Sequence, residues 1–234
     1  MSGRLHLVGG GWGGSPGPWR PFLADARSAG GSQRPRIAVL AVRDGDEREH
    51  AERLVAALGG PVDPRIATAP HGGTLDAAVL DDVDGVLVGG GLTPAYLDAV
   101  LPLAERIRAL VAAGRPYAGF SAGSAIAARH ALLGGWRHDG VPVVDEEIGE
   151  DLGELLVRDG LGLTDLTIDV HAAQWGTLAR LITAVGGGLV PEGAAIDEDT
   201  ALVLGDAATV AGTGNVWWVS SGDGAVAVRR EPAA

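Results

Sequence analysis

The chain has 234 residues, a formal net charge of −12 and a sequence pI of about 4.8. It contains no cysteine, and all 18 of its basic residues are arginine. These counts exclude disulfides, cysteine-based zinc sites, thiol nucleophiles, Ser-Lys dyads, Schiff-base chemistry and a P-loop ATPase. Because the acids are spread along the chain and no basic stripe exists, we predict no binding to nucleic acid or to anionic membranes.

The length favours one domain over residues 1–234, large enough for a full α/β core. The first apolar run, residues 5–8, is too short for a signal peptide, and no apolar stretch reaches 18 residues. We therefore predict a cytoplasmic protein without a membrane segment.

A strand is predicted at residues 5–8, followed by a glycine-rich loop at 9–14. Gly9, Gly11 and Gly14 match the dinucleotide pattern G-x-G-x-x-G, but prolines follow where that pattern needs a helix. We interpret the loop as a glycine turn that lets its backbone approach neighbouring loops.

Strands and helices then alternate along the first half of the chain. The pattern predicts strands at residues 37–42, 85–88 and 116–120, and helices at 47–58, 76–80, 94–113 and 122–132. Such alternation is typical of a three-layer α/β/α domain with a mostly parallel sheet, whose ligands bind at the carboxyl ends of the strands.

The second half is less regular. Residues 134–159 are acidic, and a strand at 166–170 and a helix at 177–185 follow. Four short runs then predict small antiparallel hairpins at one edge of the sheet: residues 201–204, 209–211, 216–219 and 225–228.

Gly-Phe-Ser-Ala-Gly, residues 119–123, has the sequence of a nucleophile elbow, a sharp turn between a strand and a helix with Ser121 at its centre. Gly119 and Gly123 are expected where a Cβ would collide with neighbouring chain. The turn would expose the serine hydroxyl and direct the backbone N–H of Ala122 towards an oxyanion.

A serine hydroxyl needs a base, and histidine is the side chain whose pKa suits neutral pH. Among the six histidines, His171 follows a predicted strand and so should lie at the edge where Ser121 emerges. We select it as the general base. His6 and His50 are interpreted as structural or solvated.

Several further motifs occur together with these residues. They are Gly-Gly-Gly-Leu-Thr-Pro (89–94), Gly-Phe-Ser-Ala-Gly-Ser (119–124), Gly-Leu-Gly-Leu (160–163), Ile-Asp-Val-His (168–171), Gly-Thr-Leu-Ala-Arg-Leu (176–181) and Ile-Asp-Glu-Asp-Thr-Ala (196–201). In order and spacing this set resembles the cyanophycinase and aspartyl dipeptidase (peptidase E) family of serine peptidases. The resemblance covers residues 5–219.

The resemblance implies a fold like that of class I glutamine amidotransferases and a Ser-His-acid triad. Ser121 matches the nucleophile and His171 the base. The matching acid, in the segment after the elbow helix, is Asp139. Three other acids compete for that role by their place in the sequence: Glu146, Glu147 and Glu150.

The resemblance also assigns an oxyanion hole and a substrate pocket. The oxyanion donors would be the backbone N–H groups of Gly91 and Ala122. Leu92, Gln174 and Trp175 stand where the pocket is expected, and Leu92 and Trp175 replace polar or charged family residues. This substitution predicts a more apolar pocket than that of cyanophycinases.

The leading prediction is a serine hydrolase that cleaves a small peptide or isopeptide bond through an acyl-enzyme, without a metal or organic cofactor. The resemblance also implies a homodimer. A glutaminase of the amidotransferase type is disfavoured because that chemistry uses a cysteine in the elbow. The alternative is a non-catalytic binding or partner subunit that retains the fold.

Overall fold

A computed structural model describes residues 3–234. Its main sheet has seven strands, and five neighbouring strands of this sheet run parallel to one another. Across the sheet the strands are β13 (Thr209–Gly212), β12 (Thr200–Leu204), β1 (Leu5–Val8), β5 (Tyr117–Phe120), β4 (Gly85–Val88), β2 (Arg36–Val42) and β3 (Asp63–Ala69). The predicted α/β class with a mostly parallel central sheet is confirmed.

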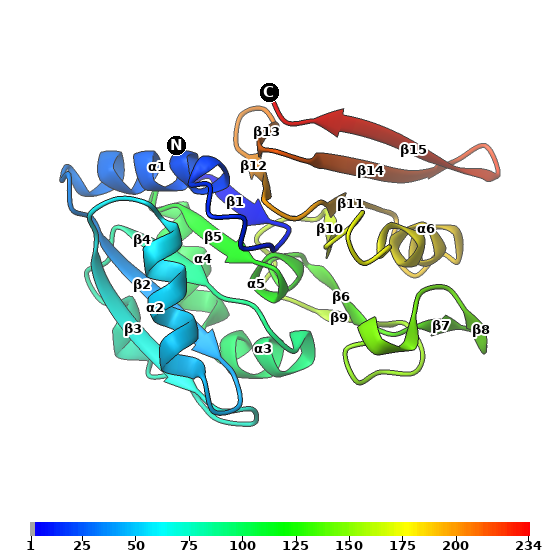
Figure 1. Ribbon diagram of the computed structural model, residues 1–234, viewed down its shortest axis with the longest axis horizontal. Helices are drawn as coiled ribbons and strands as arrows, with labels where there is room; N and C mark the ends of the chain where they lie inside the picture. Colours follow the sequence, from blue (N-terminus) through cyan, green and yellow to red (C-terminus); the bar gives the residue numbers. More distant parts are fainter. Residues whose placement is uncertain (1–2) are drawn as a thin grey trace.

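Helices cover both faces of this sheet (Figure 1). One face carries η1 (Gly17–Trp19), α1 (Arg20–Gly30) and α2 (Glu47–Ala57), and the other carries η2 (Ala77–Leu80), α3 (Thr93–Val100), η3 (Leu101–Leu103), α4 (Ala104–Ala112) and α5 (Ala122–Ala125). Alternate residues of β2 enter the two cores, with Val39 on the α1 and α2 side and Leu40 on the α3 side. This alternation produces the three layers.

A second sheet lies beside the first and has four strands. These are β10 (Thr167–Val170), β11 (Glu192–Ile196), β14 (Asn215–Gly222) and β15 (Ala225–Pro232), in that order. Helix α6 (Leu178–Gly186) packs its apolar side on this sheet through Leu181 and Val185. The C-terminal hairpins are therefore present, but β12 and β13 extend the main sheet whereas β14 and β15 belong to the second one. The prediction that all of these hairpins lie at one edge of one sheet was wrong.

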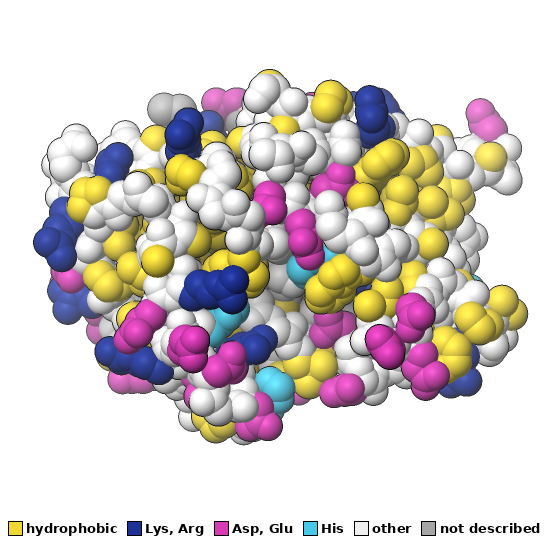
Figure 2. All heavy atoms as spheres, viewed as in Figure 1, with side chains coloured by type: hydrophobic (Ala, Val, Ile, Leu, Met, Phe, Trp, Pro, Cys, Tyr) yellow, Lys and Arg dark blue, Asp and Glu magenta, His cyan; other side chains and the backbone are white. Residues whose placement is uncertain are grey.

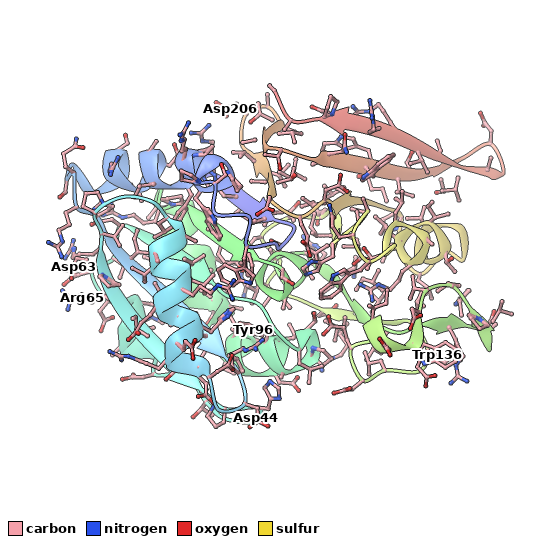
Figure 3. All side chains as sticks on the ribbon, in the orientation of Figure 1. Asp44, Asp63, Arg65, Tyr96, Trp136 and Asp206 are labelled. Carbon is pink, nitrogen blue, oxygen red and sulfur yellow. The ribbon has the colours of Figure 1, made fainter. Side chains whose placement is uncertain are left out.

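The part of the chain between α5 and β10 forms small elements. It contains the pair β6 (His130–Gly134) and β9 (Leu156–Asp159), the pair β7 (Arg137–His138) and β8 (Val141–Pro142), and η4 (Glu146–Ile148). Figure 3 shows Trp136, just before β7, at the end of the molecule away from Asp63 and Arg65 of β3.

Two predicted helices are shorter than expected. After Ser121 only Ala122–Ala125 is helical, because the backbone of residues 126–129 pairs with residues 160–163. At Gly160 a Cβ would lie 2.3 Å from the carbonyl oxygen of Ala128, so glycine permits this close approach. The helix predicted at 94–113 is interrupted at η3, where Pro102 has no N–H for the helical ladder.

Two strands of the larger sheets, β3 and β11, were not predicted, nor were η1, helix α1 and the small elements of residues 130–159. Strand β11 has the sequence Glu-Gly-Ala-Ala-Ile, with little of the β-branched or aromatic content that marks a strand. Among residues 3–234, no helix is both long and apolar enough to cross a bilayer.

Candidate active site

Ser121 occupies the tight turn between β5 and α5. Its backbone has φ 51° and ψ −113°, a conformation in which a non-glycine residue is strained. The neighbouring glycines are required sterically: a Cβ at Gly119 would lie 2.4 Å from the carbonyl carbon of Gly123, and one at Gly123 would lie 2.3 Å from the oxygen of Val88. The turn therefore has the close packing that its sequence predicted.

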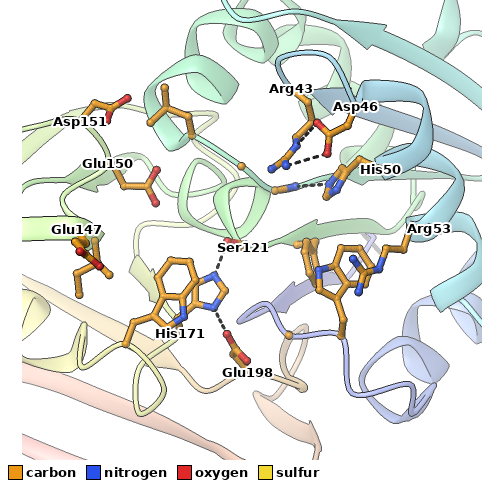
Figure 4. Close-up of a pocket in the computed structure, with 18 of the residues that line it drawn as sticks. Arg43, Asp46, His50, Arg53, Ser121, Glu147, Glu150, Asp151, His171 and Glu198 are labelled. Carbon is orange, nitrogen blue, oxygen red and sulfur yellow. Dashed lines mark hydrogen bonds and ion pairs between the residues drawn. The ribbon is translucent and has the colours of Figure 1, made fainter. Parts of the chain in front are cut away.

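His171 bonds to Ser121 through one ring nitrogen and to a carboxylate through the other (Figure 4). Nε2 lies 2.8 Å from Ser121 Oγ, and Nδ1 lies 2.7 Å from Oε1 of Glu198. With Glu198 ionised, Nδ1 carries the proton and Nε2 is left to accept the serine hydroxyl. Burial lowers the pKa of His171 below its ordinary value, and the Glu198 carboxylate opposes that shift. The imidazole is thus neutral and basic at the atom that faces the hydroxyl.

Adjacent strand ends bring these two side chains together. His171 follows β10 and Glu198 follows β11, and these strands are parallel neighbours whose carboxyl ends share one edge. Asp197 braces the same edge, because its carboxylate accepts hydrogen bonds from Ala173 N and from the indole of Trp217.

The His171 ring is packed on two sides. Trp175 stacks on it with ring centroids 3.7 Å apart and an interplanar angle of 6°. On the Cε1 side lies Gly10, where an added Cβ would be only 2.1 Å from the ring. The glycine-rich loop therefore approaches a neighbouring loop, as its interpretation predicted.

The structure does not place Asp139 beside His171. Asp139 is in the turn between β7 and β8, its side chain is 93% exposed, and its ion-pair partner is His138 at 3.8 Å. The carboxylate on His171 belongs instead to Glu198, so the assignment of the acid to Asp139 is corrected. Glu198 stands within the Ile-Asp-Glu-Asp-Thr-Ala motif, and a strand predicted before it would have drawn attention to it.

The three competing acids also lie away from His171 Nδ1. Glu146 and Glu147 are exposed in η4, and Glu147 lines the cleft beside Ser121. Glu150 is partly buried, and its Oε2 accepts the N–H of Thr93 at the start of α3. Burial raises the pKa of Glu150.

The glycine triplet 89–91 packs directly against the serine. A Cβ on Gly90 would lie 2.8 Å from the Cβ of Ser121. The N–H of Gly90 donates to Nε2 of the buried His50 at 3.2 Å, a contact that the sequence did not reveal. Within the described part of the chain, the N–H groups of Gly91 and Ala122 have no acceptor, so both remain available to a ligand.

The serine opens into a cleft of about 560 Å³ that also contains Leu92 and Trp175. Its two walls differ in charge (Figure 4). One wall is acidic, with Glu147, Glu150 and Asp151, and the other carries two arginines together with an acid and a histidine: Arg43, Arg53, Asp46 and His50. In the space-filling view this face is hollowed near its centre, with acidic and arginine side chains around the hollow (Figure 2).

Gln174 differs from the other two predicted pocket residues. It does not line the cleft; its side-chain oxygen accepts the N–H of Glu198 at 2.9 Å. Its position is therefore behind the acid, where it holds the backbone of Glu198.

A buried ion pair joins α6 to β10, the strand that precedes His171. Arg180 of α6 donates two hydrogen bonds to Asp169 of β10, at 2.9 and 2.6 Å, and a third to the carbonyl of Ile148 in η4. Because both charged side chains are almost completely buried, removing one partner would leave the other uncompensated.

Two solved structures share this fold. A peptidase from an acI-B1 Actinobacterium superposes with a TM-score of 0.60 and 18% identity, over 100% of this chain and 96% of that one. A protein provisionally named peptidase E, from Listeria monocytogenes EGD-e, superposes with a TM-score of 0.55 and 15% identity, over 90% of this chain and 98% of that one. At these identities the likeness establishes a peptidase E-like fold.

The family follows from the sequence. The family model described as "Peptidase family S51" matches residues 66–208, more than half of the chain. The chain therefore belongs to peptidase family S51, and the expectation of a serine peptidase is confirmed.

A shorter match is to a protein of a different name. Over 102 residues the chain is 40% identical to the pyridoxal 5'-phosphate synthase subunit PdxT of Frankia casuarinae (strain DSM 45818 / CECT 9043 / HFP020203 / CcI3), which covers 43% of this chain and 46% of that protein. The match thus spans about half the length of the curated relatives.

Proposed function

We propose that this peptidase hydrolyses a small peptide or isopeptide bond through an acyl-enzyme on Ser121. His171 is the general base, Glu198 orients its imidazole, and the N–H groups of Gly91 and Ala122 bind the oxyanion. The observation that carries the proposal is the continuous hydrogen-bonded series from Ser121 Oγ through His171 to Glu198, with links of 2.8 and 2.7 Å.

In the first half of the reaction Ser121 Oγ attacks the carbonyl carbon while Nε2 of His171 takes the hydroxyl proton. The carbonyl π electrons move to oxygen, which the two backbone N–H groups stabilise. When the C=O bond re-forms, the C–N bond breaks, and the leaving amine takes the proton from Nε2. An ester on Ser121 remains.

Water completes the cycle. It gives a proton to His171 as it attacks the ester, and the C–O bond to Ser121 breaks with return of that proton to the serine oxygen. The carboxylic acid product leaves. Glu198 stays ionised throughout and stabilises the imidazolium that forms in each half.

A glutaminase of the amidotransferase type is not favoured. In the amidotransferase type of glutaminase the elbow nucleophile is a cysteine, and this chain has none. A non-catalytic binding subunit is also less well supported, because such a subunit would have no need for an imidazole bonded on both nitrogens beside a strained serine.

The proposal is tested with a small fluorophosphonate and intact-mass measurement. We expect a single adduct on the wild type and none on Ser121→Ala or His171→Ala, because the probe reacts only with an activated serine. Circular dichroism of each variant confirms its fold. An adduct that survives in folded Ser121→Ala would refute the assignment, and so would a folded wild type that stays unmodified.

A further inference from the structure

A second crevice adjoins the catalytic cleft beneath the glycine-rich loop. Its volume is about 290 Å³, and Gly11, Trp12 and Arg53 line both spaces. The remaining walls of the crevice are mainly apolar: Pro16, Trp19, Ala56 and Ala57, together with glycine backbone. A molecule held at Ser121 can therefore extend into an apolar space without leaving the surface.

Trp12 is the wall between the two spaces. Its ring lies 4.5 Å from that of Phe120, the residue before Ser121, and meets the His50 ring edge-on at 5.7 Å. Trp12 is only half-buried, whereas Trp19 at the floor of the crevice is buried. The crevice is thus bounded by two indoles, one of them in contact with the serine's own neighbour.

Arg53 lies where the crevice meets the catalytic cleft. Its guanidinium lies over the Trp12 ring, 4.0 Å from the centroid. Within residues 3–234 it forms no ion pair, whereas Arg43 is paired with Asp46 and Arg48 with Glu52. Asp199, an acid in the crevice lining, accepts the N–H of Gly13.

We propose that this crevice is a specificity subsite for the C-terminal residue of a peptide substrate. The residue's aromatic or aliphatic side chain occupies the space between Trp12 and Trp19, and its α-carboxylate pairs with Arg53. The inference rests on the proposed function and deepens it, because this residue would carry the amine that leaves when Ser121 is acylated.

Two features favour this occupant over an acidic side chain or an internal peptide segment. The planar guanidinium matches a carboxylate in geometry, and no other group at the junction offers a free positive charge. Since the adjoining walls are apolar, the negative charge has to come from the chain terminus rather than from the side chain. A C-terminal residue carries both a carboxylate and an apolar side chain on one Cα.

Binding of a ligand to the subsite can be measured without enzymatic turnover. We would titrate the ¹⁵N-labelled protein with L-phenylalanine and with L-phenylalaninamide, and follow the indole N–H signal of Trp12, identified by its loss in Trp12→Phe. The expected result is a saturable shift whose half-point for the free acid is about tenfold below that for the amide, because only the acid pairs with Arg53.

Variants on α2 provide the matched comparison. Arg53→Gln is expected to abolish the preference for the acid, whereas Arg48→Gln, on the same helix but paired with Glu52, should retain it. An unmoved Trp12 signal, equal half-points in the wild type, or an unchanged preference in Arg53→Gln would each overturn the subsite.

Fluorophosphonate labelling of the same samples separates the two proposals. Binding of L-phenylalanine with no labelling of Ser121 would contradict the catalytic assignment while supporting the subsite. Labelling without a Trp12 response would do the reverse.

Discussion

Two buried histidines lie on opposite sides of Ser121, and their surroundings give them different chemistry (Figure 4). Burial lowers the pKa of both. His171 bonds to the serine hydroxyl and to the Glu198 carboxylate, which can compensate a positive charge on the ring. His50 accepts a backbone N–H from Gly90, and no hydrogen bond or ion pair among the described residues joins it to a carboxylate.

The difference shows that the partner of the second ring nitrogen, rather than burial, decides what a histidine beside a nucleophile can do. His171 can gain a proton in the transition state. His50, whose pKa falls to about 4, stays neutral and serves as a fixed acceptor for the glycine triplet. In the proposed mechanism His171 transfers protons, whereas His50 holds the backbone of Gly90.

The largest expected effect comes from removing the carboxylate on His171. Glu198→Gln should lower kcat by about 10⁴-fold, because the amide no longer holds the productive tautomer or stabilises the imidazolium. Steady-state kinetics on a cleaved peptide measure it. The exposed Asp139→Asn is the control and should leave kcat unchanged; a large loss there with little loss in Glu198→Gln would reverse the assignment of the acid.

A smaller loss of kcat is expected when His50, on the other side of Ser121, is replaced. His50→Ala should lower kcat by about 10- to 100-fold with little change in KM, because Gly90 loses its acceptor and the neighbouring oxyanion donor is less well held. His50→Gln should recover most of the loss, since its side-chain oxygen can accept the same N–H.

The control for this side is His71→Ala, in an exposed loop, which should have no effect. Equal rates in His50→Ala and the wild type would show that the imidazole does not position the triplet. A loss that His50→Gln does not recover would indicate packing against Trp12 instead.

The smallest effect is on stability and depends on pH. The folded pKa of His50 is about 4, below the ordinary 6.5, because of burial and the charges of Arg43 and Arg53, opposed by Asp46. Above pH 6.5 the ring is neutral in both states and its contribution is complete. Between pH 6.5 and 4 the unfolded chain binds a proton that the folded chain does not, so stability falls as pH falls.

At pH 5 this difference should amount to about 2 kcal/mol in the free energy of unfolding. Urea denaturation at pH 7.5 and pH 5 measures it, with His50→Gln as the comparison because that variant lacks the titrating group. The wild type should lose more stability than the variant over this interval. An identical loss in both would mean that the pKa of His50 is not lowered on folding.

Much of this arrangement could be predicted from the sequence. Apolar runs identified the strands that lead to Ser121 and His171, and these residues meet as predicted. The reasoning assumed one shared sheet, whereas β5 belongs to the main sheet and β10 to the second one. The glycines around Ser121 had a steric reason that the backbone distances confirm. Local patterns sufficed to place each residue at a strand end or in a tight turn, although the contacts they make join distant segments, such as Gly123 and Val88.

The acid and the positioning histidine depend on contacts between distant segments. Glu198 follows a strand whose small residues carry weak strand propensity, so its edge position was not visible. His50 faces inwards on a helix, as many core histidines do, and only the packing of α2 against the glycine triplet gives it a partner 40 residues away. The short α5 has the same origin, since pairing with residues 160–163 overrides the helical composition of residues 126–129.

The confinement of the His171 ring between Trp175 and Gly10 has a thermodynamic consequence. A free imidazole samples several orientations, and a catalyst that must select one of them loses entropy in each turnover. Here that entropy is lost once, on folding, so in the proposed mechanism the activation entropy of acylation need not include it. Position 10 consequently sets the mobility of the base, and any side chain there would wedge the ring away from Ser121.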